Sequence, residues 1–232
     1  MHVLLVSENM LNQQTLSRTL PFAIYIFLLA VADYLTPLLI NIGLDLKWLY
    51  IIKIVSVGIA LFYFKNRYIE LYKFPPLEDF LYAGIAGLIV FVIWIFPYPT
   101  WTMLGKDTVG FNPVIGQGGA EAFLWLSTRI LGAALIVPVM EELFWRSFIM
   151  RWFDNENFLT IKPENISSFA YLGSACLFAI EHNLWLAGLF AGLVYGELYK
   201  TYKNLWVPIF AHAVTNGVLG IWVVATHNWR YW

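Results

Sequence analysis

The sequence predicts an all-α fold, a polytopic bundle of about seven to eight transmembrane helices. Only 12% of its residues are charged, whereas soluble domains contain about 25%. Hydrophobic residues make up 60% of the chain, and its mean hydropathy is +0.67. Such a composition is typical of a chain that lies mostly in lipid. With no internal repeat or second domain visible, we expect a single membrane domain over residues 1–232.

The individual helices follow from the lengths of the apolar stretches. A spanning helix needs about 20 mostly apolar residues. Residues 1–20 are more polar and are interpreted as an interfacial lead-in that the mature protein keeps. An eighth helix could lie in that segment or in the loop 98–121. The seven stretches that we expect to be helices are residues 20–42, 47–64, 78–97, 122–150, 167–183, 184–200 and 204–226.

Lysine and arginine residues predict the orientation of these helices. Cytoplasmic loops carry an excess of positive residues, so the more basic side is expected to be cytoplasmic. That side would include the N-terminus, and the C-terminus would lie outside. The less basic side has Lys47, Lys106 and Arg230, and the more basic side has Arg18, Lys65, Arg67, Lys73, Arg151, Lys162, Lys200 and Lys203.

Net charge and cysteine content exclude some classes of function. The formal net charge is −1, so no basic field would recruit nucleic acid. Cys176 is the sole cysteine of the sequence, which excludes an internal disulfide framework and a cysteine metal cluster. The partners expected from composition are the lipid bilayer and membrane-associated molecules.

Charged residues inside the predicted helix 122–150 are the most informative feature of the chain. Glu141 and Glu142 are adjacent within an apolar stretch, and Arg146 follows one turn after Glu142. A charge at membrane depth costs several kcal/mol unless it has a partner or faces a water-filled cavity. The spacing of Glu142 and Arg146 predicts an ion pair on one helix face. Ionisable residues at this depth are candidates for a functional site.

Two further motifs place polar residues inside apolar helices downstream. Phe178 and His182 are four residues apart and so share a helix face, as do His212 and Asn216. At about 1.5 Å per residue, Glu141 and His212 come to similar depths, and His182 lies deeper. Three helices could therefore bring two carboxylates, two imidazoles and an amide to one buried site.

Each of these features also has a purely structural interpretation. A single histidine in a membrane helix often only bonds a neighbouring helix. The pair Glu142–Arg146 alone could be a structural clamp, and we interpret Glu181 and Glu197 as structural. A clamp does not need two histidines and an asparagine on other helices. The combination therefore favours a site with chemistry.

The residue types in this combination are suited to amide hydrolysis. A carboxylate and a neutral imidazole that flank one water can remove its proton, which is worth roughly 10²–10⁴ in rate. A second imidazole and an amide can donate to a polarised carbonyl and act as an oxyanion hole. Covalent catalysis is less favoured, because Ser147 has no histidine at a fixed spacing and Cys176 has apolar neighbours that favour an inert thiol.

Residues 120–220 resemble a known family of membrane proteins, the type II CaaX prenyl protease and bacteriocin-processing (CPBP) family. The stretch from Gly192 through Pro208 to His212 is similar to that family as well. The resemblance rests mainly on three motifs in the same order, Glu141-Glu142-x-x-x-Arg146, Phe178-x-x-x-His182 and His212-x-x-x-Asn216.

The resemblance implies a CaaX-type intramembrane glutamate protease, which is an endopeptidase. We expect no cofactor, with zinc as the alternative. Glu141 and His182 would activate water, and His212 and Asn216 would stabilise the oxyanion. The Glu142–Arg146 pair would support and orient the site. The catalytic core would cover residues 120–220, preceded by N-terminal helices and a loop over residues 1–119.

A second similarity concerns the substrate. The phrase Glu-Glu-Leu-Phe-Trp-Arg-Ser-Phe-Ile-Met-Arg-Trp at residues 141–152, with the aromatic N-terminal helices, is similar to a bacterial branch associated with exosortase systems. This similarity implies a protein of the bacterial inner membrane. Its substrate would be a membrane-associated protein or peptide of an exosortase-linked pathway rather than a prenylated protein.

Other functions stay open at this point. A zinc-dependent protease would use Glu141, His182 and His212 as ligands with an open fourth position, although no His-Glu-x-x-His helix is present. A non-catalytic membrane binding or immunity protein would keep the site as a polar clamp. A transporter would use the same residues as an ion pathway. The intact set of motif residues favours the enzyme.

Overall fold

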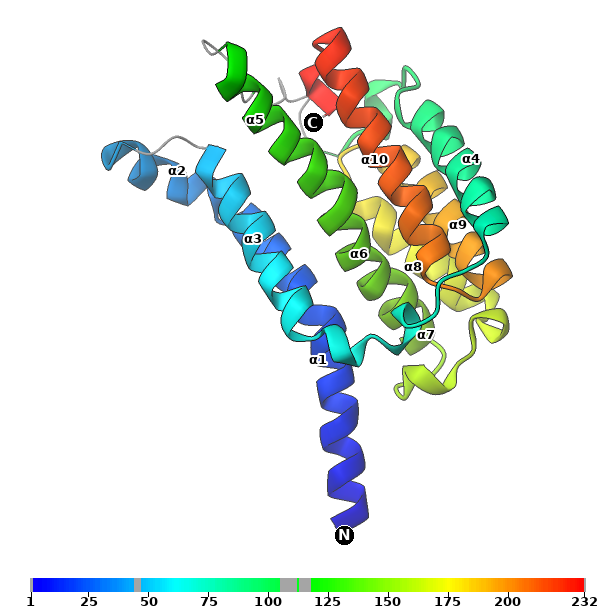
Figure 1. Cartoon of the computed structure of the whole chain (residues 1–232). Coiled ribbons are helices and arrows are strands. Elements are labelled where there is room, and N and C mark those ends of the chain that lie inside the picture. The colour runs from blue at the N-terminus through cyan, green and yellow to red at the C-terminus, as the bar shows by residue number, and fades with distance from the viewer. Residues whose placement is uncertain (1, 44–46, 105–111, 113–117, 232) are drawn as a thin grey trace.

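The computed structural model describes residues 2–43, 47–104, 112 and 118–231. Every regular element in these residues is helical (Figure 1), which confirms the predicted all-α class. Two π-helical segments, Gly132–Ile136 and Leu143–Ile149, join three of the helices into one long run. The α-helices are α1 (His2–Ala30), α2 (Ala32–Asn41), α3 (Lys47–Tyr63), α4 (Leu77–Trp94), α5 (Gly119–Leu131), α6 (Val137–Glu142), α7 (Met150–Trp152), α8 (Ser168–Glu181), α9 (Trp185–Tyr202) and α10 (Trp206–Thr226).

The helices form a membrane bundle, as predicted. By length and composition, three of the described helical segments can cross a membrane: Leu77–Trp94, Gly119–Trp152 and Trp206–Thr226. The bent pair of α1 and α2 would add a fourth span. Seven helical segments do lie close to the predicted ranges, but fewer of them can span than the seven to eight expected. The reason is partly length, because α3 has only 17 residues and α8 only 14.

The first helix differs from the prediction. α1 begins at His2, so the expected lead-in is helical from that residue onward. The stretch expected as one helix over 20–42 is divided between α1 and α2, whose axes differ by 70°. Pro37 in α2 has no N–H to bond the carbonyl of Asp33, and its ring crowds that carbonyl. This crowding lies within one turn of the bend.

Glycines let the helices that carry the polar motifs approach closely. On α4, a Cβ at Gly87 would collide with the backbone oxygen of Ala211, the residue before His212 on α10. On α9, the position of a Cβ at Gly192 lies 3.1 Å from Cα of Ala175 on α8. Small residues are typical of helix interfaces in membranes, where close packing drives association. As a result α4, α8, α9 and α10 form one packed group (Figure 1).

The basic residues predicted to share one side gather at one end of the bundle. The α3–α4 connection, α7 and the α9–α10 turn all lie at the end from which α1 projects (Figure 1). The start of α3, with Lys47, and the C-terminal residues around Arg230 lie at the opposite end. Lys106, which was assigned to that opposite side, is outside the described residues.

A buried ion cluster at the basic end of the bundle joins α1 to the α3–α4 connection and to α7. Glu70, in the α3–α4 connection, lies 2.6 Å from Nη2 of Arg18 on α1 and 2.6 Å from Nη2 of Arg151 on α7. The hydroxyl of Ser147 donates to the same carboxylate. Burial raises the pKa of Glu70, but the two guanidinium groups and the hydrogen bonds outweigh it and hold that pKa below its usual value.

Candidate active site

The glutamate pair 141–142 ends the short helix α6, between the two π-helical segments. Pro138 accounts for the first of these segments. Its nitrogen cannot donate to the carbonyl of Ala134, and its ring would crowd that carbonyl in a regular α-helix. The turn widens, and the N–H of Val137 bonds the carbonyl of Gly132, five residues earlier. π-Helical bulges of this kind are frequent at functional sites.

Glu142 lies at the centre of a buried ion cluster. Its Oε1 accepts a hydrogen bond from Nδ1 of His212 at 2.9 Å, and its Oε2 lies 3.1 Å from Nε of Arg146. Arg146 also donates from Nη2 to the carbonyl of Gly192 at 3.3 Å. The side chains of Glu142 and Arg146 are 0% and 1% exposed. The ion pair expected from the four-residue spacing is present, and it connects the long helical run to α9 and α10.

His212 on α10 is held from two sides. Because the carboxylate of Glu142 can only accept, Nδ1 of His212 carries the proton of their hydrogen bond. The ring of Tyr195 on α9 stacks on the imidazole, with centroids 4.8 Å apart and planes 19° apart. The Tyr195 hydroxyl donates to Thr215 at 2.7 Å, and Thr215 donates to a backbone carbonyl of α4 at 2.8 Å. The second imidazole nitrogen, Nε2, lies 3.9 Å from Oε2 of Glu141.

His182 lies at the point where α8 ends. Its backbone angles, φ −103° and ψ 137°, are extended and stop the helix. Nδ1 donates to the carbonyl of Phe178 at 2.7 Å, so a neutral imidazole keeps its lone pair on Nε2. The ring centroids of Phe178 and His182 are 4.5 Å apart, in line with their four-residue spacing. Trp94 on α4 packs edge-on against the imidazole, with centroids 5.3 Å apart.

Asn216 is anchored by the first π-helical segment. Its Nδ2 donates to the carbonyl of Ala133 at 2.9 Å. With the five-residue pairing of a π-helix, this carbonyl would accept from the N–H of residue 138, and Pro138 has none. The asparagine amide therefore makes a hydrogen bond that the helix itself cannot make. One N–H of the amide is left for other partners.

One cavity of about 600 Å³ joins these groups, a volume in the range of ligand pockets. Neither Glu142 nor Arg146 is part of its wall. Glu142 bonds Nδ1 of His212, whereas Nε2 of the same ring is the nitrogen near Glu141. Oε2 of Glu141 is buried and has no hydrogen-bond partner among the described residues. Four of the six candidate residues line the cavity, namely Glu141, His182, His212 and Asn216.

The three residues named as ligands in the zinc alternative share this cavity. Glu141, His182 and His212 all line its wall. Within the part of the chain that the structure describes, no three or more His, Cys, Asp or Glu side chains are arranged to hold a metal ion. Of the three, only Glu141 and His212 have a recorded approach, the 3.9 Å between Oε2 and Nε2.

The candidate residues lie in a segment whose sequence matches a known protein family. Residues 123–218 match the sequence model of the family described as type II CAAX prenyl endopeptidase Rce1-like. This Rce1-like segment makes up less than half of the chain. The Rce1-like segment contains all six candidate residues, and the wider CPBP resemblance seen in the motifs is thereby confirmed.

A curated relative and a search of solved structures complete the comparison. A protein of Bacillus subtilis (strain 168) named "Putative membrane peptidase YdiL" is 26% identical to this chain over 137 residues. The match covers 57% of this chain and 47% of that protein, so it spans about half the length of the relative. No solved structure matches the chain.

The Rce1-like segment does not build the cavity alone. Tyr25 on α1, Tyr50 and Lys53 on α3 and Trp94 on α4 also line the wall. Sequence reasoning missed these four residues because their helices carry no recognisable motif. They reach the cavity only through the packing of α1, α3 and α4 against the segment.

Two other residues near the site could have been recognised from the sequence. Tyr195 lies between Gly192 and Gly196, in the stretch already similar to the family, and its place in that stretch was the available signal. Glu181, interpreted as structural, accepts a hydrogen bond from Nε1 of Trp145 at 3.0 Å and is not in the cavity wall.

Proposed function

We propose that this protein is an intramembrane endopeptidase that hydrolyses a peptide bond with a water activated by Glu141 and His182. The observation that carries the proposal is the carboxylate oxygen of Glu141, which is buried without a hydrogen-bond partner in the described residues and faces a cavity also lined by both histidines. The match of residues 123–218 to the Rce1-like family and the peptidase name of the Bacillus relative support the class of reaction.

The proposed reaction adds one water across one amide bond. Glu141 takes one proton from the water, while Nε2 of His182 accepts a hydrogen bond from the second hydrogen, which stays on the oxygen, and so orients the water. The water oxygen bonds the carbonyl carbon, and the negative charge moves to the carbonyl oxygen. When the C–N bond breaks, the proton held by Glu141 passes to the leaving nitrogen. The products are a new carboxyl terminus and a new amine.

His212 and Asn216 would stabilise the negative oxygen of the intermediate. Asn216 has one amide N–H beyond the bond to Ala133. For His212 to donate from Nε2 it must carry protons on both nitrogens, and Glu142 then bears the compensating negative charge. Arg146 holds Glu142 in place through the ion pair. Removal of one such donor typically costs about 10²–10³ in rate.

The test compares two carboxylates. Membranes from cells that lack the protein would be complemented with wild type, with Glu141→Gln or with Glu197→Gln, and new protein termini would be identified by mass spectrometry. Glu197→Gln is the matched control, because Glu197 is an exposed carboxylate on α9 outside the cavity wall. We expect new termini with wild type and with the control, and a loss of at least roughly 10²-fold with Glu141→Gln. Unchanged termini with Glu141→Gln would contradict the proposal.

The setting of the reaction is part of the proposal. The chain is a membrane protein, and the similarity of residues 141–152 to an exosortase-associated branch favours a bacterial inner membrane. The partner would be a membrane-associated protein or peptide substrate in an exosortase-linked pathway. The same terminal proteomics would identify it, since the substrate is the protein whose terminus changes.

One observation favours a non-catalytic alternative. Glu142, Arg146 and His212 form a buried ion cluster, which would clamp the helices without any reaction. A binding or immunity protein would need only that clamp. It would not need Glu141, so Glu141→Gln would then leave its biological effect intact, whereas the protease would lose it.

A further inference from the structure

Two cationic side chains line the same cavity as Glu141 and the histidines, and the proposed reaction does not use them. Lys53 comes from α3 and Arg129 from α5. They share one aromatic ring: Nζ of Lys53 lies 5.5 Å and Cζ of Arg129 lies 5.2 Å from the ring centroid of Tyr50. The Tyr50 hydroxyl donates to the backbone carbonyl of Arg129 at 2.8 Å, which fixes the two helices together at this point.

Lys53 has no anionic partner among the residues that the structure describes. Its ammonium lies 4.2 Å from the ring centroid of Tyr25, and the contacts recorded for it are with aromatic rings. Among the described side chains, none forms a hydrogen bond or ion pair with it. A cation inside a membrane helix is costly unless it pairs or faces water, and such residues mark binding sites. The wall of the cavity therefore includes two cations besides the carboxylate of Glu141.

We propose that Lys53 and Arg129 bind a carboxylate of the peptide substrate, either its C-terminal carboxylate or an acidic side chain. The inference rests on the proposed protease function, because it assigns this end of the cavity to the substrate. Guanidinium and ammonium groups are suited to carboxylates, and hydrogen bonds between charged partners are about twice as strong as neutral ones. The half-buried position of both side chains strengthens the attraction.

The distance along the helix sets where the bond would be cut. Arg129 and Glu141 are twelve residues apart on one continuous helical run, which is about 18 Å at 1.5 Å per residue. Both side chains lean toward the N-terminus of the run, so the spacing of their ends is similar. An extended peptide covers about 3.3–3.6 Å per residue. The bound carboxylate would thus lie about five residues from the bond that is hydrolysed.

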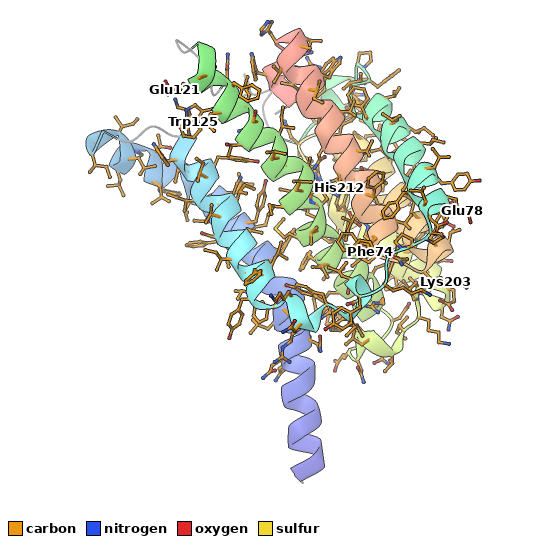
Figure 2. The ribbon with its side chains drawn as sticks, viewed as in Figure 1. Phe74, Glu78, Glu121, Trp125, Lys203 and His212 are labelled. Atoms are coloured by element: carbon orange, nitrogen blue, oxygen red, sulfur yellow. The ribbon has the colours of Figure 1, made fainter. Side chains whose placement is uncertain are left out.

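Figure 2 shows the direction of this spacing. Glu121 and Trp125 lie toward the far end of α5, and His212 lies nearer the middle of the bundle on α10. Arg129 follows Trp125 by one turn in the sequence. The substrate would therefore extend from the reactive groups toward the end of the bundle where α5 begins.

Binding of defined peptides tests the subsite. Pools of apolar decapeptides without Asp or Glu would be made with a free C-terminal carboxylate, with a C-terminal amide, and with an amide plus one Asp. The protein would be Glu141→Gln in phosphatidylcholine nanodiscs, and retained peptides would be counted by mass spectrometry. We expect the free-acid or the Asp pool to be retained at least about tenfold over the plain amide pool. Equal retention of all pools, or of none, overturns the proposal.

Charge-removing variants locate the carboxylate. Added to the same protein, Lys53→Met and Arg129→Met should each abolish the difference between acid and amide, and Arg129→Lys should keep most of it. Lys65→Met is the matched control, because Lys65 also lies over a ring, that of Phe62 at 3.9 Å, but outside the cavity. If Arg129→Met does not fold, Lys53→Met and the comparison of pools still decide the question. A difference that survives in Lys53→Met overturns the assignment.

Two further measurements distinguish this proposal from lipid binding and from the protease proposal on which it rests. If the variants lose binding of added phosphatidylglycerol while acid and amide peptides are retained equally, the site takes lipid phosphate and the peptide proposal fails. Cleavage of the same peptides by the wild-type protein then tests the protease proposal separately from the subsite proposal. Retention of acid peptides without any cleavage would contradict the protease proposal and support the subsite. Equal cleavage of acid and amide peptides would support the protease proposal and contradict the subsite.

Discussion

At the scale of single residues, Glu141 and Glu142 show how one helix can hold an ion-paired carboxylate and a cavity-lining carboxylate side by side. Consecutive residues of an α-helix point about 100° apart, because a turn takes 3.6 residues. Glu142 therefore faces the core, where His212 and Arg146 bond it, and Glu141 faces the cavity. The different surroundings lead to different predictions for the two.

Removing either member of the buried ion pair should destabilise the protein. We expect Glu142→Gln and Arg146→Ala each to lower the thermal midpoint in detergent, because each leaves its partner's charge buried. Breaking a buried pair typically costs about 3–5 kcal/mol. Differential scanning fluorimetry would measure the shift. Glu156→Gln, in an exposed loop, should melt like wild type. Midpoints equal to wild type in both variants would mean that the pair does not contribute to stability.

Chelation should distinguish a bound water from a bound metal. We expect turnover to survive extensive chelation, and elemental analysis to find no stoichiometric zinc. The reason lies in the proposed mechanism, in which Asn216 and His212 donate to the same oxygen, because a metal-bound nitrogen of His212 could not donate as well. If activity stops on chelation, returns with zinc and follows one zinc per chain, the zinc version is correct and the protease assignment stands.

At the scale of elements, the π-helical segments adjust the register of the long helix that carries the glutamates. The first segment leaves the carbonyl of Ala133 without a helical partner, since Pro138 cannot donate, and Asn216 bonds it instead. A single proline thus couples the shape of one helix to the orientation of a side chain on another. The coupling can be tested from either side.

Restoring the missing N–H should disturb the site without weakening the fold. Pro138→Ala supplies a donor for the helix and removes the ring that crowds Ala134. We expect a regular α-helical turn, release of Asn216 and at least about a tenfold loss of activity, with a thermal midpoint equal to or above that of wild type. Activity and melting would be measured on the same preparation. Full activity would show that the π-helical register is dispensable.

The close approach of α4 and α10 gives a second prediction at this scale. A Cβ at Gly87 would meet the backbone of Ala211, which cannot move unless the helix moves. Gly87→Ala should therefore cost about 1–3 kcal/mol and shift His212. Gly84→Ala is the control on the same helix, because its Cβ would lie at an ordinary 3.7 Å from Phe210. Thermal unfolding and turnover should change in the first variant alone, and equal effects would contradict the packing argument.

At the scale of the whole molecule, the cavity depends on helices from both halves of the chain. The Rce1-like segment supplies the candidate reactive groups, and α1, α3 and α4 supply much of the remaining wall. The cluster of Arg18, Glu70 and Arg151 ties these parts together at the basic end. Since that cluster contains one carboxylate between two guanidinium groups, it should make stability depend on pH.

The pH dependence has a definite sign. The pKa of Glu70 is lower in the folded protein than its unfolded value of about 4.3. Its contribution to stability is therefore complete above that value and is lost as pH falls through the folded pKa. We expect wild type to melt above Glu70→Gln near neutral pH, and the gap to narrow in acid. Glu156→Gln should follow wild type at every pH. A gap that is constant with pH would contradict the role of the charge.

Much of the architecture was predictable because it depends on local composition and spacing. The charged fraction and the apolar stretches indicate a helical membrane protein, and the four-residue spacing of Glu142 and Arg146 predicts their ion pair. The start of α1 and the bend before Pro37 were predicted wrongly. Helix ends depend on a few hydrogen bonds and on packing, which hydropathy over 20 residues does not resolve.

By itself, the sequence indicated a helical membrane protein, a resemblance of residues 120–220 to one family, and six candidate residues for a reactive site. It could do so because helix periodicity and motif order are properties of a local stretch of chain. Only the tertiary structure decided which of the six line a cavity, that Tyr195 stacks on His212, that Ala133 anchors Asn216 and that Lys53 shares the wall with Glu141. These contacts join residues far apart in the chain, and their geometry depends on how closely the helices pack.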